Sequence, residues 1–376
     1  ISELKIMLPQ FSSRLVPFET VYFGGGTPSL APIEDIEAIL STIRNLVGLA
    51  PNAEVTLEAH PSTLNASTAQ HLNSSTPQRW KDIGINRVSL GIQSLSSKAA
   101  LKDSKRQHGI EEALFAAKMV IEAMGQKGTS LDLLAGLPGE TLSDFDESVQ
   151  RAIETGAGHL SVYALSIEPG TNLARRIGER PDVLSSLKRP EKYRRAQSLL
   201  QDLYNQYEVA SFHLKGLPQL KSRHNEIYWD PDRDFLAAGM GAASLINGKR
   251  FVRPSTLKGY FDYVHRLEAT GSYDENQGES EVDSPYDSIK IAAMARLRTE
   301  KGASYRQFIE AANRAKLLSF EQENKLVNAL NGFKRKFSEV FEDTKEDMLV
   351  VKKEEFGILE DVLVELFIVI DRLDLN

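Results

Sequence analysis

Residues that could bind a ligand follow a series of short apolar segments in the first half of the chain. They comprise glycines, hydroxyls, carboxylates and an amide: Gly25, Gly26, Thr27, Glu58, Gln93, Asp132 and Ser166. Glycines let backbone groups approach a ligand where a Cβ atom would block them. Ionised carboxylates accept strong hydrogen bonds from ammonium and hydroxyl groups. A tight turn at the glycines and ordinary strand-end caps at the carboxylates are the structural alternatives to a binding site.

Alternating strands and helices would bring these residues together. The β-rich segments run over Thr20 to Phe23, Glu54 to Glu58, Arg87 to Gln93, Ser130 to Ala135 and His159 to Ile167. Helical spacing of apolar residues follows over Ile33 to Val47, Glu111 to Met124, Leu142 to Thr155 and Glu191 to Tyr204. This order predicts βαβ units around a parallel sheet. Because no dinucleotide fingerprint is present, a barrel or partial (β/α) barrel is favoured over a doubly wound sheet, although periodicity alone does not separate them. In a barrel, the polar residues would lie at its carboxyl rim.

A polar segment in the last third marks the expected domain boundary. Residues Gly271 to Pro285 are rich in Gly, Ser, Asn, Asp and Glu, and the pattern beyond them is largely helical. We therefore expect a barrel with its extension over 1–270 and a small α-rich domain over 286–376. A winged-helix-like arrangement is one option for that second domain.

The composition is that of an ordinary globular protein. Of the 376 residues, 41% are hydrophobic and 26% charged, and the net charge of -7 argues against a nucleic-acid surface. The longest apolar run, Val362 to Ile370, is interrupted by Glu365 and is too short to cross a bilayer, so we expect no transmembrane segment. The sequence contains no cysteine, which excludes disulfides and cysteine-based metal sites within it.

Four motifs in a fixed order resemble one branch of the radical S-adenosylmethionine (SAM) superfamily. They are Val21 to Leu30, Thr56 to Pro61, Gly84 to Ser94 and Leu131 to Gly139. This branch contains oxygen-independent coproporphyrinogen III oxidase and the haem chaperone HemW. The resemblance extends from about Phe18 to Val264 and implies the partial barrel of radical SAM proteins.

The resemblance also implies roles for individual residues. Gly25, Gly26 and Thr27 resemble the loop that holds the methionine part of SAM. Arg106, within Arg106-Gln107-His108, resembles the guanidinium that pairs with the SAM carboxylate, although a solvated loop charge is the alternative. The other positions that the resemblance assigns to SAM are Glu58, Gln93, Asp132 and Ser166.

Two further segments are similar to the HemW version of the branch. One is His159 to Thr171 with its Glu168-Pro169 ending, and the other is the motif His224-Asn225-x-x-Tyr228-Trp229. The resemblance makes His224 the candidate haem ligand, because imidazole binds iron well and neighbouring aromatic rings can stack on a porphyrin. Simple packing of a histidine beside a tryptophan is the alternative. Ala243 replaces a histidine that is usual in the branch.

The leading hypothesis is therefore a HemW-like haem-trafficking protein that binds SAM and haem, with a haem-accepting protein as its partner. An oxidase that decarboxylates coproporphyrinogen III and a non-catalytic paralogue are the two alternatives. The family holds a [4Fe-4S] cluster with a C-x3-C-x2-C loop, which would lie upstream of Ile1. We expect the sequence to be a fragment, with a cluster only if that loop precedes it. The resemblance places a eukaryotic member in mitochondria and a bacterial one in the cytoplasm.

Overall fold

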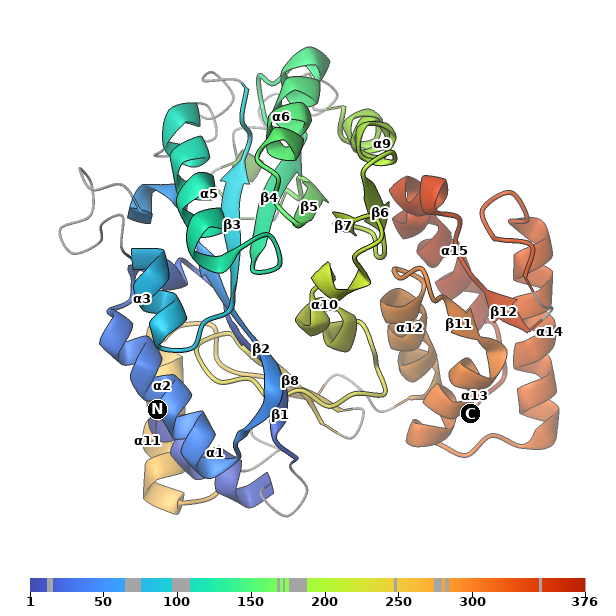
Figure 1. Cartoon of the computed structure of the whole chain (residues 1–376). Helices are drawn as coiled ribbons and strands as arrows, with labels where there is room; N and C mark the ends of the chain where they lie inside the picture. The colour runs from blue at the N-terminus through green and yellow to red at the C-terminus, as the bar shows by residue number, and fades with distance from the viewer. Residues whose placement is uncertain are drawn as a thin grey trace. The chain divides into compact units, whose positions relative to one another are not determined.

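The computed structural model describes residues 1–11, 16–64, 76–96, 109–167, 170–171, 173–175, 188–246, 249–273, 279–280, 284–344 and 347–375. These residues form two compact units (Figure 1). The sheet unit combines Thr20–Glu37 with Ala53–Ser222, and the C-terminal unit combines Ile1–Glu19, Ala38–Asn52 and Arg223–Asn376. The expected boundary at 271–285 lies inside the C-terminal unit. An independent domain over 286–376 stays a prediction.

A seven-stranded sheet of order β1-β2-β3-β4-β5-β7-β6 forms the core of the sheet unit. Its strands are β1 (Phe18–Phe23), β2 (Leu49–Ala59), β3 (Arg87–Gln93), β4 (Thr129–Ala135), β5 (His159–Ala164), β6 (Tyr204–Gln206) and β7 (Ser211–Leu214). The strands β2 to β5 pair in parallel, which confirms the predicted α/β architecture. Strand β7 pairs antiparallel with both β5 and β6, an addition that the sequence pattern did not predict.

The helix expected over Glu191 to Tyr204 is shorter than predicted. Helix α9 runs over Arg189–Leu200, and Tyr204 begins strand β6 instead. The Tyr204 side chain is buried, and its hydroxyl donates to the Ala157 carbonyl at 2.7 Å. This long-range contact outweighs the local helical pattern.

Apolar side chains cover one face of the parallel strands and pack under the helices. These helices are α3 (Thr76–Asp82), α5 (Ile110–Met124), α6 (Leu142–Glu154) and α9, with α2 (Ile33–Leu46) earlier in the chain. Helix α5 packs on β3 and β4, and α9 packs on β4 and β5. The strand residues that are fully buried include Val88, Leu90, Ile92, Leu131, Leu133, Leu160 and Val162. Burying each of these large side chains contributes about 1.5–3 kcal/mol relative to exposure.

The alternate residues of the same strands form a polar row across the sheet. Glu58 pairs with Ser89, Ser89 with Ser130, and Ser130 with His159, while Asp132 pairs with Ser161. Strands of a parallel sheet that is buried on both faces are usually apolar on both faces. The polar face therefore indicates a region built for hydrogen bonding.

The C-terminal unit joins small sheets to a group of helices. A three-stranded antiparallel sheet has the order β10-β9-β8, and β11 pairs with β12. The strands are β8 (Ala243–Ile246), β9 (Lys249–Val252), β10 (Glu279–Ser280), β11 (Ala303–Ser304) and β12 (Met348–Leu349). The helices are α1 (Ser2–Phe11), α10 (Arg223–Tyr228), α11 (Leu257–Thr270), α12 (Pro285–Arg296), α13 (Tyr305–Ala315), α14 (Phe320–Lys336) and α15 (Leu359–Asp371). The predicted helical character of the last part of the chain is confirmed.

Serine caps explain where three of these helices begin. The hydroxyls of Ser284, Ser304 and Ser319 each accept a hydrogen bond from the backbone N–H three residues later, at the first turns of α12, α13 and α14. Helix α1 is anchored by a buried ion pair, in which Arg253 Nε donates to Glu3 Oε1 at 2.9 Å.

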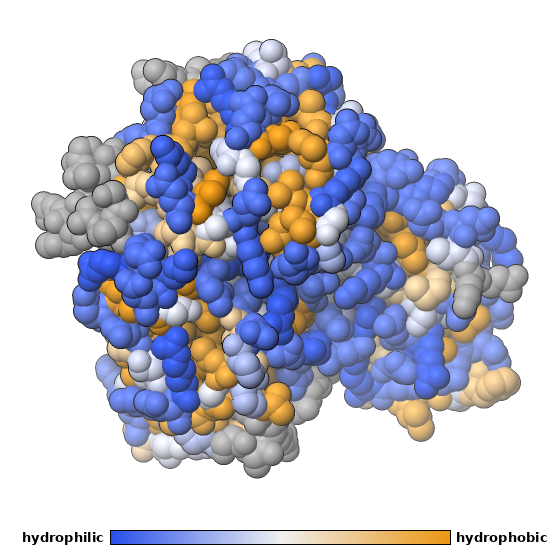
Figure 2. Space-filling view, viewed as in Figure 1, coloured by the Kyte–Doolittle hydropathy of each residue, from blue (hydrophilic) through white to orange (hydrophobic). Residues whose placement is uncertain are grey.

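Hydrophilic residues cover most of the face shown in Figure 2, and apolar residues lie between them in small groups. Among the described residues, no helix has the length and apolar character that a membrane crossing needs.

Candidate functional site

The glycine loop after β1 holds the carboxylate of Glu58. Gly25 Nα–H donates to Glu58 Oε2 at 3.1 Å, and the Tyr22 hydroxyl donates to Oε1 at 2.8 Å. Gly25 and Gly26 have φ values of +82° and +65°, which favour glycine, and a Cβ atom at either would meet no described atom within 4 Å. A Cβ at Gly24 would lie 2.7 Å from the Tyr22 ring. The loop thus orients Glu58 and leaves open space beside its backbone.

Burial raises the pKa of Tyr22 far above its usual value, and the charges of Glu58 and Asp132 raise it further. The phenol therefore keeps its proton and remains a donor to Glu58. After the loop, the buried Ser29 hydroxyl accepts from His60 N at 3.2 Å and from the Thr63 hydroxyl at 2.9 Å. These bonds tie the segment after the glycines to the end of β2.

Gln93, the last residue of β3, has a backbone conformation that is rare for its type. Its φ is +67°, and Ser94 N donates to Ile92 O at 2.8 Å, which closes a γ-turn of the positive-φ kind. The register between β3 and β4 shifts at this point. Gly91 leaves room for the Gln93 amide, because a Cβ there would lie 2.8 Å from Gln93 Nε2.

Neighbouring contacts hold this turn in place. The Ser94 hydroxyl donates to Glu140 Oε1 at 3.2 Å, and Leu95 N donates to the Ser148 hydroxyl at 2.6 Å. Strained residues of this kind persist only where the surroundings over-determine them, and they concentrate at functional sites. The turn aims the Gln93 amide over the polar face of the sheet.

Asp132 lies within β4 and not at its carboxyl end, where the sequence pattern had suggested a strand-end residue. Its Oδ2 accepts from the Ser89 hydroxyl at 2.7 Å and its Oδ1 from the Ser130 hydroxyl at 3.4 Å. Burial raises the pKa of Asp132 to about 6, against hydrogen bonds from Ser89 and Ser161 that lower it, while the Glu58 charge raises it further. The strand continues past Asp132 and so places the carboxyl group deeper than expected.

The structure thus brings most of the predicted SAM residues to one region. Gly25 donates to Glu58 and Gly26 follows it in the loop. Glu58 interacts electrostatically with Asp132, and Gln93 ends the strand between them. Thr27 precedes a short 3-10 helix, and its carbonyl oxygen accepts from Leu30 N at 3.0 Å. Ser166 follows β5 and is exposed. Arg106, Glu168 and Pro169 lie outside the described residues.

Sequence reasoning missed the side chains that contact the two carboxylates, Tyr22, Ser89, Ser130 and Ser161, and His159 beyond Ser130. Polar residues at every second position of otherwise apolar strands were the signal that could have revealed them, because alternate residues share a face.

The motif that begins at His224 forms helix α10 and the turn after it. His224 is partly accessible, and Tyr228 is 44% exposed. The Tyr228 ring contacts Trp229 edge-to-face with 4.9 Å between centroids, and it lies 5.3 Å from the Phe235 ring. These rings give the end of α10 an aromatic surface with one open side.

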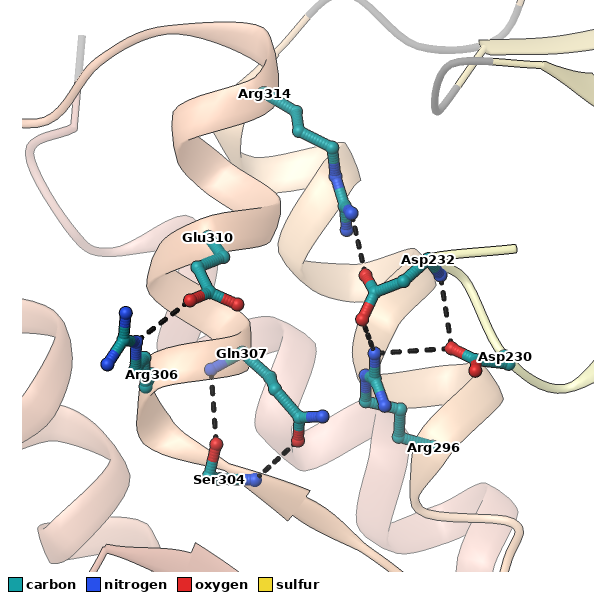
Figure 3. A network of polar contacts seen from close by, with 8 residues as sticks. All are labelled: Asp230, Asp232, Arg296, Ser304, Arg306, Gln307, Glu310 and Arg314. Carbon is teal, nitrogen blue, oxygen red and sulfur yellow. Dashed lines mark hydrogen bonds and ion pairs between the residues drawn. The ribbon is translucent and has the colours of Figure 1, made fainter. Parts of the chain in front are cut away.

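Basic residues from α12, from the segment after it and from α13 hold the turn after α10. The Arg298 guanidinium lies 5.2 Å above the Trp229 ring. Figure 3 shows Arg296 between Asp230 and Asp232, and Arg314 on Asp232 with an N–O distance of 2.6 Å. The aromatic end of α10 is therefore fixed by α12 and α13.

The residues present do not fit an iron–sulfur cluster. The sequence supplies no thiolate, and no set of three His, Asp or Glu side chains among the described residues is placed to hold a metal ion.

The chain is similar in sequence to known proteins. Residues 12–152 match the radical SAM superfamily. The chain is 35% identical over 317 residues to the haem chaperone HemW of Synechocystis sp., covering 81% of this chain and 70% of that one. For HemW of Escherichia coli the identity is 31% over 301 residues, covering 77% and 71%.

The fold is similar to that of a solved structure, "Coproporphyrinogen III oxidase (HemN) from Escherichia coli is a Radical SAM enzyme", with a TM-score of 0.74. That similarity covers 97% of this chain and 81% of the other at 18% identity, so it concerns the fold alone. On the sequence matches to HemW and the superfamily match together, the chain belongs to the HemW family of haem chaperones within the radical SAM superfamily.

Proposed function

We propose that this protein is a haem chaperone that binds SAM on the polar face of the sheet unit and haem at the end of α10. The observation that carries the SAM part is the convergence of the glycine loop, Glu58, Gln93 and Asp132 at neighbouring strands. Family membership favours the chaperone over the oxidase and over a non-catalytic paralogue.

The side chains present suit SAM as a ligand. SAM supplies a sulfonium, an ammonium group and ribose hydroxyls, which are cationic groups and hydrogen-bond donors. Glu58 and Asp132 are acceptors of such donors, and the backbone at Gly25 and Gly26 has open space beside it. Arg106 and Ser166 complete the proposed set, with Arg106 pairing the ligand's carboxylate.

Binding of SAM to the full chain can be measured by isothermal titration calorimetry. Changing Glu58→Gln removes the ionised acceptor, so we expect a loss of about 1.5–3 kcal/mol, or roughly 10- to 100-fold in Kd. Glu34→Gln is the matched control, because Glu34 is an exposed carboxylate on α2 of the same unit that pairs with Arg79. Equal affinities for the two variants, or no binding by the unaltered protein, would refute the SAM site.

Haem is the proposed cargo at α10. An accessible imidazole, an exposed tyrosine ring and a tryptophan held by Arg298 lie within six consecutive residues. Imidazole nitrogen is a common axial ligand of haem iron, and aromatic rings offer an apolar surface for the porphyrin. A further contact ties α10 to the residues after α12, because Lys301 Nζ lies 3.5 Å from Glu226 Oε1 on α10.

A haem titration followed at the Soret band tests this assignment. Changing His224→Ala removes the proposed iron ligand, and we expect the shifted Soret band of the bound form to disappear. His265→Ala, which removes an exposed imidazole from α11, should leave that band unchanged. A Soret shift that survives in His224→Ala would assign haem binding elsewhere.

A haem-accepting protein is the proposed partner. The proposed compartment is the mitochondrion for a eukaryotic source and the cytoplasm for a bacterial one. A mouse relative, "Radical S-adenosyl methionine domain-containing protein 1, mitochondrial", is 32% identical over 233 residues and supports the first location. Fractionation of cells that express the natural gene checks it.

A further inference from the structure

A line of buried polar side chains connects Asp132 to the antiparallel edge of the sheet. The Ser130 hydroxyl lies 3.4 Å from Asp132 Oδ1 and 2.8 Å from His159 Nδ1. His159 Nε2 lies 2.9 Å from the Tyr207 hydroxyl. Ser130, His159 and Tyr207 are all buried, so their hydrogen bonds do not exchange readily with water.

The Asp132 end of this line selects the direction of its hydrogens. An ionised Asp132 can only accept, so Ser130 donates its single hydroxyl hydrogen to it and accepts from His159 Nδ1–H. The imidazole then accepts at Nε2 from the Tyr207 hydroxyl, whose oxygen also accepts from Ser222 N at 3.1 Å. The reversed order would leave Asp132 without one of its donors.

We propose that Tyr207 and His159 are positioning residues for Asp132, which act through Ser130 to keep one hydroxyl hydrogen on Asp132 Oδ1. The positioning role itself does not depend on the proposed SAM site. Its consequence for binding rests on that site, because a carboxylate with a fixed donor presents its remaining lone pairs to a ligand in a fixed direction. The hydrogen bonds run in series from Tyr207 through His159 to Ser130, so the loss of any member frees the Ser130 hydroxyl to rotate away from Asp132.

The groups around the line keep it neutral. Burial lowers the pKa of His159 well below its usual value, and the charges of Arg87 and His213 lower it further. Arg87 is buried, and its Nη1 donates to the Leu220 carbonyl at 3.4 Å. The groups that face Asp132 from the other strands are Glu58 on β2, Tyr22 on β1 and Tyr163 on β5. The imidazole therefore stays uncharged while Asp132 titrates.

The test measures the pKa of Asp132 by 13C NMR in the full chain, with labelled aspartate and with the signal assigned through its loss in Asp132→Asn. Tyr207→Phe removes the first donor of the line and does not contact Asp132. Since a donor to a carboxylate lowers its pKa, we expect Tyr207→Phe and Ser130→Ala to raise the pKa of Asp132 by up to about one unit.

Tyr204→Phe is the matched control. It removes another buried tyrosine hydroxyl from the same antiparallel edge, but that hydroxyl donates to Ala157 O and is not connected to Asp132. If Tyr207→Phe changes the pKa of Asp132 no more than Tyr204→Phe does, the positioning role is wrong. Should Ser130→Ala fail to fold, Tyr207→Phe alone decides.

The pH dependence of SAM binding provides the second measurement. The affinity of the unaltered protein should fall as acid protonates Asp132, and Tyr207→Phe should move this fall to higher pH. Tyr204→Phe should leave it in place, and an unmoved fall in Tyr207→Phe would overturn the proposal. If the unaltered protein fails to bind SAM, the proposed function is refuted, whereas the NMR comparison still decides the role of Tyr207 and His159.

Discussion

The molecule contains two polar networks of opposite construction. In the sheet unit, Tyr207, His159 and Ser130 lead to Asp132 as buried neutral groups in single file. In the C-terminal unit, Arg296 and Arg314 share Asp232 as charged groups, and Asp232 is 43% exposed (Figure 3). Buried hydrogen bonds in series fix the direction of each hydrogen, and the loss of one group breaks the series. An exposed carboxylate shared by two arginines keeps one partner when the other is lost. The first construction suits orientation of an acceptor, and the second suits attachment of one segment to another.

The largest effect is expected where a charge is buried. Lys192 Nζ donates to Glu140 Oε2 at 2.9 Å, both side chains are 0% exposed, and burial raises the pKa of Glu140 although Lys192 lowers it. Lys192→Met leaves this carboxylate without its cation, so we expect a loss of about 3–5 kcal/mol in the free energy of unfolding. Urea denaturation measures it.

The control for this comparison is Lys325→Met, which breaks an exposed pair with Glu321 on α14 and should lower the free energy of unfolding far less. The double change Lys192→Met with Glu140→Gln should recover part of the loss, because no buried charge remains unpaired. Similar losses for Lys192→Met and Lys325→Met would remove the contrast between buried and exposed charges.

An intermediate effect is expected from pH, with opposite signs in the two networks. The pKa of Asp132 is raised from 3.8 to about 6, so its contribution to stability is present below pH 4 and is lost as pH rises through 6. We expect a change on the order of 1–3 kcal/mol across this window. Amide hydrogen exchange in β4 measures this change when the unaltered protein is compared with Asp132→Asn. A difference in exchange protection between the two proteins that stays constant between pH 4 and 6 contradicts the prediction.

Asp232 should respond in the other direction. Burial alone would raise its pKa, but hydrogen bonds and charges from Arg314 and Arg296 outweigh this and leave the pKa lowered. Its contribution is therefore present above the usual aspartate pKa and is lost as the pH falls through the lowered value. The comparison of Asp232→Asn with the unaltered protein should show stability lost in acid.

The smallest effect is expected from one arginine of the shared network. Arg314→Met leaves Arg296 on Asp232, so the loss should be only about 0.2–1 kcal/mol and should vanish near 1 M salt. Arg306→Met is the matched control on the same helix, since Arg306 pairs with the exposed Glu310 one turn away, as Figure 3 shows. A loss above about 2 kcal/mol for Arg314→Met would show that the network is not redundant.

The sequence pattern predicted the parallel strands of the sheet. The two ends of β3, Arg87 and Gln93, were predicted correctly, because a turn precedes the strand and its alternating pattern stops at Gln93. The meeting of Glu58 with the glycine loop was also expected, since both follow neighbouring strands. These features depend on local spacing and on the general geometry of parallel sheets.

The contacts between distant segments could not be predicted. Tyr204 pairs with Leu214 of β7 and its hydroxyl bonds to Ala157 O, and Tyr207 reaches His159 across a separation of 48 residues. No local pattern encodes these partners, because the antiparallel edge that supplies them is formed by short strands of three and four residues.

The positive φ of Gln93 has a consequence for how the protein evolves. A left-handed non-glycine residue costs about 1–2 kcal/mol, so glycine at this position would make the fold more robust. Glycine would also remove the amide that lies over Gly91 and the polar face. Selection for thermal robustness and selection for ligand binding therefore oppose each other at this one residue.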